Sequence, residues 1–289
     1  MNIIYIGQLI VLSILLGLIY VCMAVGLNII YGVMKMVNWA HGAFVMLGAY
    51  IAYWLFVLYG IYPYIGAIIA AAIISMLGLA VHELALRPIF KAKYFRAMAL
   101  IITYGLSILL INVARVLWTD VLRGVSLKEP PFNISGISIS RPYLYGGLFA
   151  FISSIILYVV LKKTYIGKAI RATSQDSPVA MLMGINTEFI SRFTFMVGSA
   201  LAGLTGGLLC TIFAVTPEMG SVLGVKAVTI VVLGGLGSYI GALVGGLLLG
   251  FAEVIGTYLL GARYQPLFYF LTLVLILLFK PTGIAGEAE

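Results

Sequence analysis

Two polar side chains stand close together in a stretch of sequence that is otherwise apolar. Asn38 and His41 lie three positions apart, Lys35 precedes them and Gly42 follows. An amide and an imidazole on one helix face can hydrogen-bond a zwitterionic solute or its water, and polar groups at membrane depth indicate function by default. The alternative is that both only bond neighbouring helices, for about 0.6 to 2 kcal/mol each. A lone histidine does not predict a metal site, and we expect none.

The elements around these residues would have to interrupt a membrane helix. Asn38 is a good N-cap residue, so we expect a half-helix to begin there. Its N-terminus would offer unpaired N–H groups and partial positive charge to a carboxylate. Thr103 and Ser107, in a later apolar segment, form a second polar line that could face the same cavity. The alternative for these two is a bond to their own helix backbone.

The composition places the whole chain in a membrane. Of 289 residues, 63% are hydrophobic and 9% are charged, and no Asp, Glu, Lys or Arg occurs between Met36 and His82. This predicts an all-α polytopic membrane protein, a single transmembrane domain over 1–289. The net charge of +8 comes from loops between apolar spans, so nucleic acid is not an expected partner and membrane lipid is.

Span lengths and loop charges give a topology. Segments 87–96 and 162–192 are basic and should face the cytoplasm, whereas the loop at about 119–141 should lie outside. The C-terminal tail then falls outside, unless a re-entrant segment in the glycine-rich region reverses it. A bilayer needs about 20 apolar residues per helix, which predicts about eight spans: 4–27, 37–59, 64–86, 97–118, 142–162, 193–214, 227–252 and 263–280.

Glycines in the last third predict a second break and close helix packing. Gly234, Gly235 and Ser238 belong to a run with three glycines in four residues, where we expect broken backbone beside a pathway. Glycines spaced by four form stripes without side chains, along which another helix can approach closely. These are Gly237, Gly241 and Gly245, and then Gly246 and Gly250.

The cytoplasmic loop, about 163–192, contains a short apolar helix. Ser177 is a plausible N-cap, Pro178 suits the first helical turn and Gly184 suits the position after the last. The helix between them is too short to be stable alone. We therefore expect it to dock in a groove of a partner, the alternative being that it lies on its own protein or on headgroups.

A membrane transporter whose energy comes from a separate chain docked on this helix is one interpretation, and three other classes of protein are alternatives to it. An ion-coupled secondary transporter wants a buried acid, which only Glu253 offers, and we expect Glu253 at a helix end instead. A water-channel-like pore would need a second copy of the Asn38 motif and its proline, and neither is present. An intramembrane serine hydrolase would need G-x-S-x-G, which GLGSY does not match.

Four blocks of sequence, in order along the chain, resemble a known family. They are GLNIIYGVMKMVNWAHGAFVMLGAYIA, GKAIRATSQDSPVAMLMGIN, VKAVTIVVLGGLGSYIGALVGGLLLGFAE and LLFKPTGIAG. Together they resemble the branched-chain amino acid ABC transporter permeases, of the high-affinity leucine, isoleucine and valine type. Relatives in that family carry urea, amides and other amino acids, so the solute stays open.

The resemblance implies a multi-pass subunit of a prokaryotic plasma (inner) membrane importer. It would pair with a homologous or identical permease, two cytoplasmic ATPases and an external solute-binding protein. The chain itself would be no enzyme and bind no cofactor, since the ATPases use the ATP. Ala180 and Gly184 match the family's ATPase-docking motif, but the acid expected near its start is missing and Asp176 is the nearest. We therefore expect the ATPase contact at Asp176, Ser177, Pro178, Ala180, Met181 and Gly184.

Overall fold

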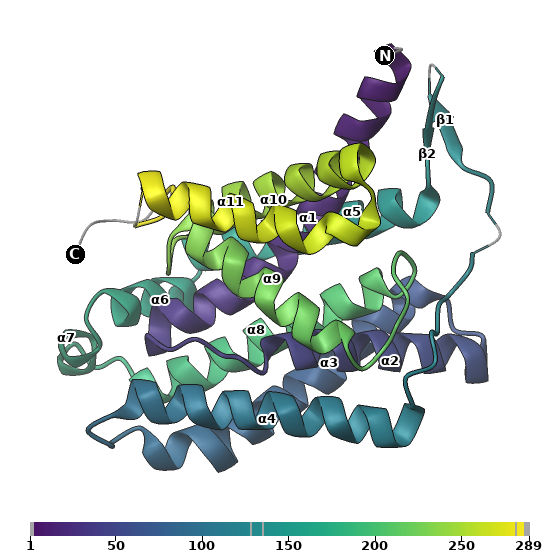
Figure 1. The fold of residues 1–289 in the computed structure, drawn as a ribbon. Coiled ribbons are helices and arrows are strands. Elements are labelled where there is room, and N and C mark those ends of the chain that lie inside the picture. Colours follow the sequence, from purple (N-terminus) through teal and green to yellow (C-terminus); the bar gives the residue numbers. More distant parts are fainter. Residues whose placement is uncertain (1–2, 128, 135, 281, 286–289) are drawn as a thin grey trace.

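A long central helix organises the molecule. In the computed structural model, which describes residues 3–127, 129–134, 136–280 and 282–285, α1 (Ile3–Met34) is buried on every side from Ile19 to Ile30. It has no charged residue, and a helix that is apolar all round must be enclosed by other helices or by lipid. Helices α5, α8 and α10 pack along it (Figure 1).

The other helices complete a bundle that has a small hairpin at one end (Figure 1). They are α2 (His41–Tyr59), α3 (Pro63–Val81), α4 (Phe95–Trp118), α5 (Arg141–Lys163), α6 (Tyr165–Gln175), α7 (Ser177–Leu182), α8 (Thr187–Leu209), α9 (Met219–Gly234), α10 (Tyr239–Leu260) and α11 (Gln265–Phe279). A π-helical turn (His82–Leu86) and a 3₁₀ turn (Arg87–Ile89) extend α3, and another 3₁₀ turn (Ala262–Tyr264) precedes α11. Strands β1 (Phe132–Ile134) and β2 (Ile137–Ile139) pair antiparallel, with Phe132 opposite Ile139.

Eight helical segments in the described part of the chain are long and apolar enough to cross a membrane. This confirms the predicted class, an all-α polytopic membrane protein with about eight spans. The predicted span 227–252 is wrong, because the structure divides it between α9 and α10. With 16 residues, α9 is shorter than the length expected of a span.

The additional helix reverses the expected side of the C-terminus. The backbone N–H groups of Ile284 and Ala285 donate to the carbonyl oxygens of Leu233 and Gly234 at the end of α9, both at 2.9 Å. This stretch therefore lies at the end of the bundle that carries α6 and α7, opposite the hairpin and the N-terminus (Figure 1). We call the two ends of the molecule the α6–α7 end and the hairpin end.

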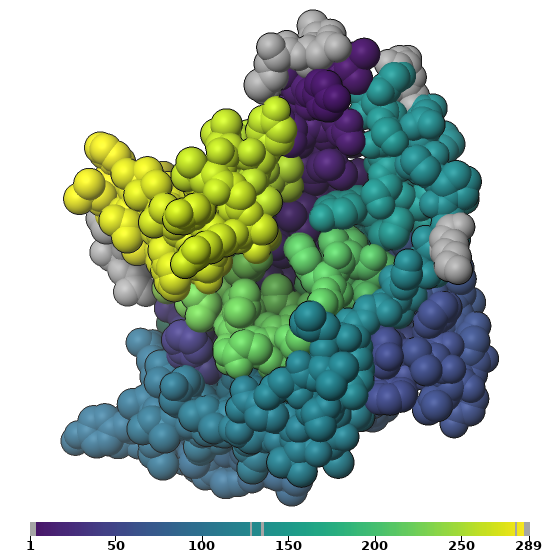
Figure 2. Space-filling view, turned by 45° about the vertical axis from the view of Figure 1, so that its right-hand side comes forward, coloured from purple at the N-terminus to yellow at the C-terminus, as the bar shows by residue number. Residues whose placement is uncertain are grey.

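Seen from another side, the molecule is hollowed along α9. Figure 2 shows α9 in green on the floor of a recess between α10 and α11, in yellow-green and yellow, and α4, in blue-teal. One face of α9 is more exposed than the rest of the helix, and its Val222 is 41% exposed. No other part of the described chain covers this face in the recess.

Candidate functional site

The start of α2 is a re-entry into the bundle. The chain turns at Lys35, whose φ of 51° is left-handed, and runs back beside α1. The His41 Nε2 then lies 3.0 Å from the carbonyl oxygen of Met23, about three turns before the end of α1. Segment 35–40 is thus non-helical backbone alongside a membrane helix, which is tolerated only inside protein or beside a water-filled cavity.

Asn38 supports this turn, although not as the predicted N-cap. Ala40 holds the N-cap position, and its side chain makes no capping bond. Asn38 Oδ1 instead accepts from the Ala40 N–H at 3.1 Å, and its own carbonyl accepts from the His41 N–H at 3.2 Å. Asn38 and His41 are 0% and 1% exposed, so both are enclosed by protein in this conformation, and their contact with solute stays a prediction. Each retains one buried nitrogen without a hydrogen-bond partner, Asn38 Nδ2 and His41 Nδ1.

The predicted second polar line meets the same turn. Thr103 on α4 is fully buried, and its hydroxyl accepts from the Trp39 N–H at 3.2 Å while donating to the carbonyl of Leu100. Ser107, one turn further along α4, is also buried. The structure therefore brings Asn38, His41 and Thr103 to one re-entrant turn, whose backbone Asn38 and Thr103 satisfy, while no hydrogen bond links Ser107 to this turn in the described residues.

Gly42 lies where α2 crosses α9 at backbone distance. A Cβ atom on Gly42 would come within 2.2 Å of the Gly220 carbonyl oxygen and 2.3 Å of the Gly224 nitrogen. Only glycine fits this crossing without moving one helix. The re-entrant helix is therefore held directly against the floor of the recess in Figure 2.

The second predicted break lies between α9 and α10. Gly235 and Gly237 have φ angles of 102° and 85°, a region that favours glycine. Asn28 of α1 holds this connection: its Nδ2 donates to the Ser238 carbonyl at 2.5 Å, and its Oδ1 accepts from the Gly237 N–H at 2.6 Å. Ser238 caps α10 by accepting from the Gly241 N–H.

The glycines predicted for packing separate into two groups. Gly237 lies in the connection and not on a helix stripe, so its predicted place was wrong. The other four lie on α10, Gly241 and Gly245 against Gly234 and Ile230 of α9, and Gly246 and Gly250 against Val21 and Gly17 of α1.

The two breaks approach each other at a small crevice. Val37, from the re-entrant turn, and Leu236, from the α9–α10 connection, line it together with side chains of α1 and α9. Its volume is about 10 Å³, enough for about one water molecule and too small for an amino acid. In this conformation the crevice between the two breaks is therefore too narrow to pass a solute.

A buried ion pair lies deeper in the bundle. Lys226 of α9 and Glu253 of α10 are 4% and 1% exposed, and the Lys226 Nζ is 2.8 Å from both carboxylate oxygens. Glu253 also accepts from the Tyr20 hydroxyl at 2.8 Å and from Gln265 Nε2 at 2.6 Å. The expected place of Glu253 at a helix end was wrong, since it connects α1, α9, α10 and the start of α11.

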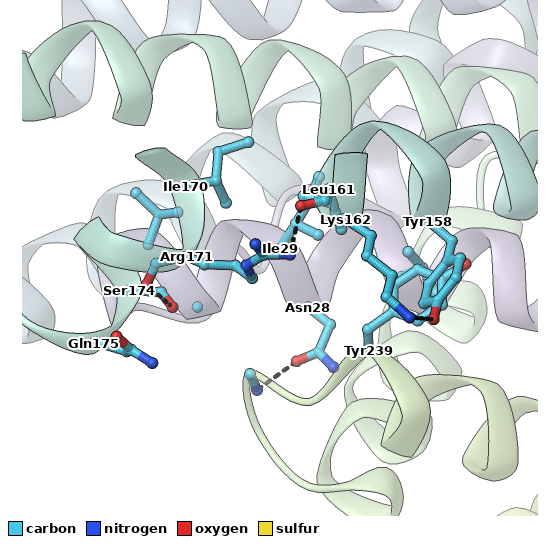
Figure 3. A pocket seen from close by; sticks show the side chains of 14 residues that line it. Asn28, Ile29, Tyr158, Leu161, Lys162, Ile170, Arg171, Ser174, Gln175 and Tyr239 are labelled. Atoms are coloured by element: carbon cyan, nitrogen blue, oxygen red, sulfur yellow. Dashed lines mark hydrogen bonds between the residues drawn. The ribbon is translucent and has the colours of Figure 1, made fainter. Parts of the chain in front are cut away.

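A cavity of about 390 Å³ opens at the α6–α7 end (Figure 3). Lys162 of α5 and Arg171 of α6 line it, and Asn28, Gly237 and Tyr239 form another part of its wall. The Lys162 ammonium donates to the Tyr158 hydroxyl at 3.1 Å, and Arg171 Nη1 donates to the Leu161 carbonyl at 2.8 Å. The cavity thus lies between α6 and the α9–α10 connection, both of which contribute to its wall.

The short apolar helix forms as α7, with a different cap from the one predicted. Asp176, and not Ser177, is the N-cap, and its Oδ1 accepts from the Val179 N–H at 3.0 Å. Pro178 lies in the first turn as expected. Gly184, with φ of 82°, ends the helix in a Schellman arrangement, in which the Ile185 N–H donates to the Ala180 carbonyl.

Helix α7 presents apolar side chains outward. Met181, Leu182 and Met183 are 61%, 87% and 79% exposed. Ala180 is 3% exposed and faces the chain itself, so a direct contact between its side chain and a partner does not fit this conformation. Just beyond α7, Glu188 pairs with Arg87 at 2.5 Å, which ties the segment to the turns that follow α3.

Sequence reasoning missed Asn28 and left Lys226 unassigned. Both could have been noticed as polar residues in strongly apolar segments. Their partners could not, because Asn28 bonds residues about 210 positions away and Lys226 meets Tyr20 at a separation of 206.

Comparison with known proteins gives one consistent family. A family model described as branched-chain amino acid transport system / permease component matches residues 9–279. The high-affinity branched-chain amino acid transport system permease protein LivH of Salmonella typhimurium is 35% identical, over 95% of this chain and 93% of its own. The corresponding protein BraD of Pseudomonas aeruginosa is 34% identical, over 99% and 97%.

A solved structure agrees on the fold. PsaBC from Streptococcus pneumoniae, in complex with Fab, is similar with a TM-score of 0.51 over 96% of this chain and 92% of that chain. At 16% sequence identity this likeness concerns the fold alone. The match of the family model and the two relatives carry the assignment: this chain belongs to the branched-chain amino acid transport system permease family.

Proposed function

We propose that this chain is the membrane-spanning permease subunit of an ATP-driven importer for branched-chain or related amino acids. Family membership supports the transport role, and α7 carries the link to ATP. An apolar helix of six residues, capped at both ends and exposed at a basic end of the bundle, has the form of a docking element.

The proposed assembly has several chains. Two ATPases bind at the α6–α7 end, a second permease, homologous or identical, covers the recess of Figure 2, and an external solute-binding protein delivers solute at the hairpin end. The setting is the inner membrane of a prokaryote. In this proposal the chain binds no cofactor and catalyses no reaction, because ATP is hydrolysed on the partner subunits.

In the proposed mechanism, access alternates between the two faces of the membrane. Closure of the ATPase pair moves α7, and the motion reaches α8 and the turns after α3 through Glu188 and Arg87. The two permeases then rock apart at the recess, whose floor, α9, is joined to α2 within each chain by the close contact at Gly42. The closed crevice at Val37 and Leu236 would widen in this step, so that the two breaks line the pathway.

The alternative, ion-coupled secondary transport, would use Glu253 as the proton carrier. Its carboxylate contacts the ammonium of Lys226 at 2.8 Å and accepts two further hydrogen bonds. Glu253 is only 1% exposed and the protein itself supplies these donors, whereas a proton carrier needs a path to water. This observation favours the importer.

Co-purification tests the proposal. Leu182→Glu places a charge on the most exposed side chain of α7, and the matched control Leu122→Glu alters a leucine that is 75% exposed in the loop at the hairpin end. Tagged chain extracted from its native cell in mild detergent should retain an ATPase, and Leu182→Glu alone should lose it. Recovery of no ATPase with the unaltered chain, together with gradient-driven uptake by that chain in liposomes, would overturn the importer and favour the alternative.

A further inference from the structure

We propose that the cavity at the α6–α7 end binds the headgroup of an anionic phospholipid. Its wall comes from α1, α5, α6 and the α9–α10 connection (Figure 3). Nothing in the transport function proposed above requires this site, and its test uses no transport or ATPase readout.

The charge of the cavity indicates an anion. Two cations, Lys162 and Arg171, line it, and no acid occurs among its lining residues. In the described part of the chain neither cation pairs with a carboxylate, since both donate to neutral oxygens. A zwitterionic amino acid would leave its ammonium group without a partner here, whereas a phosphate would compensate both cations.

A helix end adds to the same charge. The cavity wall includes Gly237 and Tyr239, on either side of the residue that caps α10. A helix of 22 residues carries partial positive charge at its N-terminus. The first turn of α10 therefore reinforces the attraction that Lys162 and Arg171 exert on an anion.

The position of the cavity favours a lipid over a soluble anion. Lys162 lies in the last turn of α5, where a membrane helix reaches the headgroup level, and α6 continues as an amphipathic helix with Tyr165 79% exposed. Beside its polar groups the cavity has apolar walls from α1, α5 and α6. Basic pockets between membrane helices on the cytoplasmic side suit anionic headgroups, with the apolar wall for the start of an acyl chain.

Lipid retention tests the site. The purified protein is placed in phosphatidylcholine nanodiscs with or without phosphatidylglycerol, extracted gently, and examined by native mass spectrometry for bound lipid. The unaltered chain should retain phosphatidylglycerol. Lys162→Gln and Arg171→Gln should each lower the affinity about fivefold, and together about 30-fold. The matched control, Lys163→Gln with Lys168→Gln, removes two neighbouring cations that do not line the cavity and should retain the lipid.

Each other outcome overturns the proposal. If Lys163→Gln with Lys168→Gln lowers the affinity for phosphatidylglycerol as much as the cavity variants do, a basic surface attracts the lipid in general. If the unaltered chain retains phosphatidylcholine and phosphatidylglycerol equally, the cavity is not an anion site. Displacement of phosphatidylglycerol by excess inorganic phosphate would assign the cavity to a free anion. Because the single variants each retain one cation, they decide the question even if the double variant does not fold.

Discussion

Removal of the Glu253 carboxylate should expose the cost of a charge buried in the bundle. Glu253→Gln keeps the size and one acceptor oxygen of the side chain but removes its charge. The ammonium of Lys226 would then retain the Tyr20 hydroxyl, 3.0 Å away, and the faces of three aromatic rings. With 4% of Lys226 exposed, water cannot replace the lost partner.

The expected loss follows from two opposing terms. Removing one partner of a buried ion pair costs about 3 to 5 kcal/mol. The rings of Tyr20, Phe213 and Tyr269, whose centroids lie 5.2 to 5.8 Å from the Lys226 Nζ, offset part of it, by about 1 kcal/mol. A net loss of about 2 to 4 kcal/mol lowers the melting temperature of a chain of this size by about 3 to 7 °C.

Thermal unfolding of the purified protein in detergent measures this loss. Lys226→Met combined with Glu253→Gln removes both charges while keeping the length of both side chains, and should recover most of the stability. Glu218→Gln is the control, because Glu218 pairs with Arg115 at 3.1 Å with its side chain 64% exposed, and such a pair contributes at most about 1 kcal/mol.

Two results would refute this reasoning. If Glu253→Gln melts with the unaltered protein, Lys226 does not depend on the carboxylate. The second result has two parts: the double variant is stable but takes up no solute, and uptake by the unaltered protein stops when a proton uncoupler is added. Glu253 would then carry protons, and the ion pair would not be structural.

Two substitutions test the breaks and the close helix crossing. Gly42→Ala should destabilise the protein by about 1 to 3 kcal/mol, because the new Cβ meets the backbone of α9. The control is Gly105→Ala on α4, which has open space around it and should be neutral or stabilise by up to about 1 kcal/mol. The melting temperatures of the two variants compare these effects. Asn28→Ala removes both hydrogen bonds that hold the α9–α10 connection, at about 1 to 3 kcal/mol, and should speed amide hydrogen exchange at Gly237; unchanged exchange there would contradict the role given to Asn28.

The sequence predicted the breaks better than the helices around them. Gly234 to Ser238 stood out because several glycines in a row disfavour a helix. The split into α9 and α10 was missed because Leu236 and the flanking valines keep hydropathy high across the connection, so that a length criterion merges one short helix with its neighbour. The extra helix places Ile284 and Ala285 at the α6–α7 end, which is the alternative that the sequence had left open.

Polar residues were recognised without their roles. For Asn38 and Thr103 the sequence left open both contact with solute and bonding within the protein, and in the structure they satisfy backbone groups of the re-entrant turn. Because broken backbone in a membrane must find partners, the same residue types serve a pathway and a turn, and sequence alone does not separate them. The cap of α7 was misplaced by one residue, from Asp176 to Ser177, because both residue types are good caps.

These contacts make α9 the element through which the two ends of the chain are joined. Gly42 fixes the re-entrant helix to α9 at backbone distance, Lys226 binds α9 to α10, and Ile284 bonds its last turn. The connection after α9 is held by Asn28 and borders the cavity beside α6. Because the connection after α9 is held by few hydrogen bonds, we expect a movement at α6 to reach the recess by bending at 235–238. In the proposed importer, a variant that stiffens this connection should therefore slow uptake while an ATPase still co-purifies.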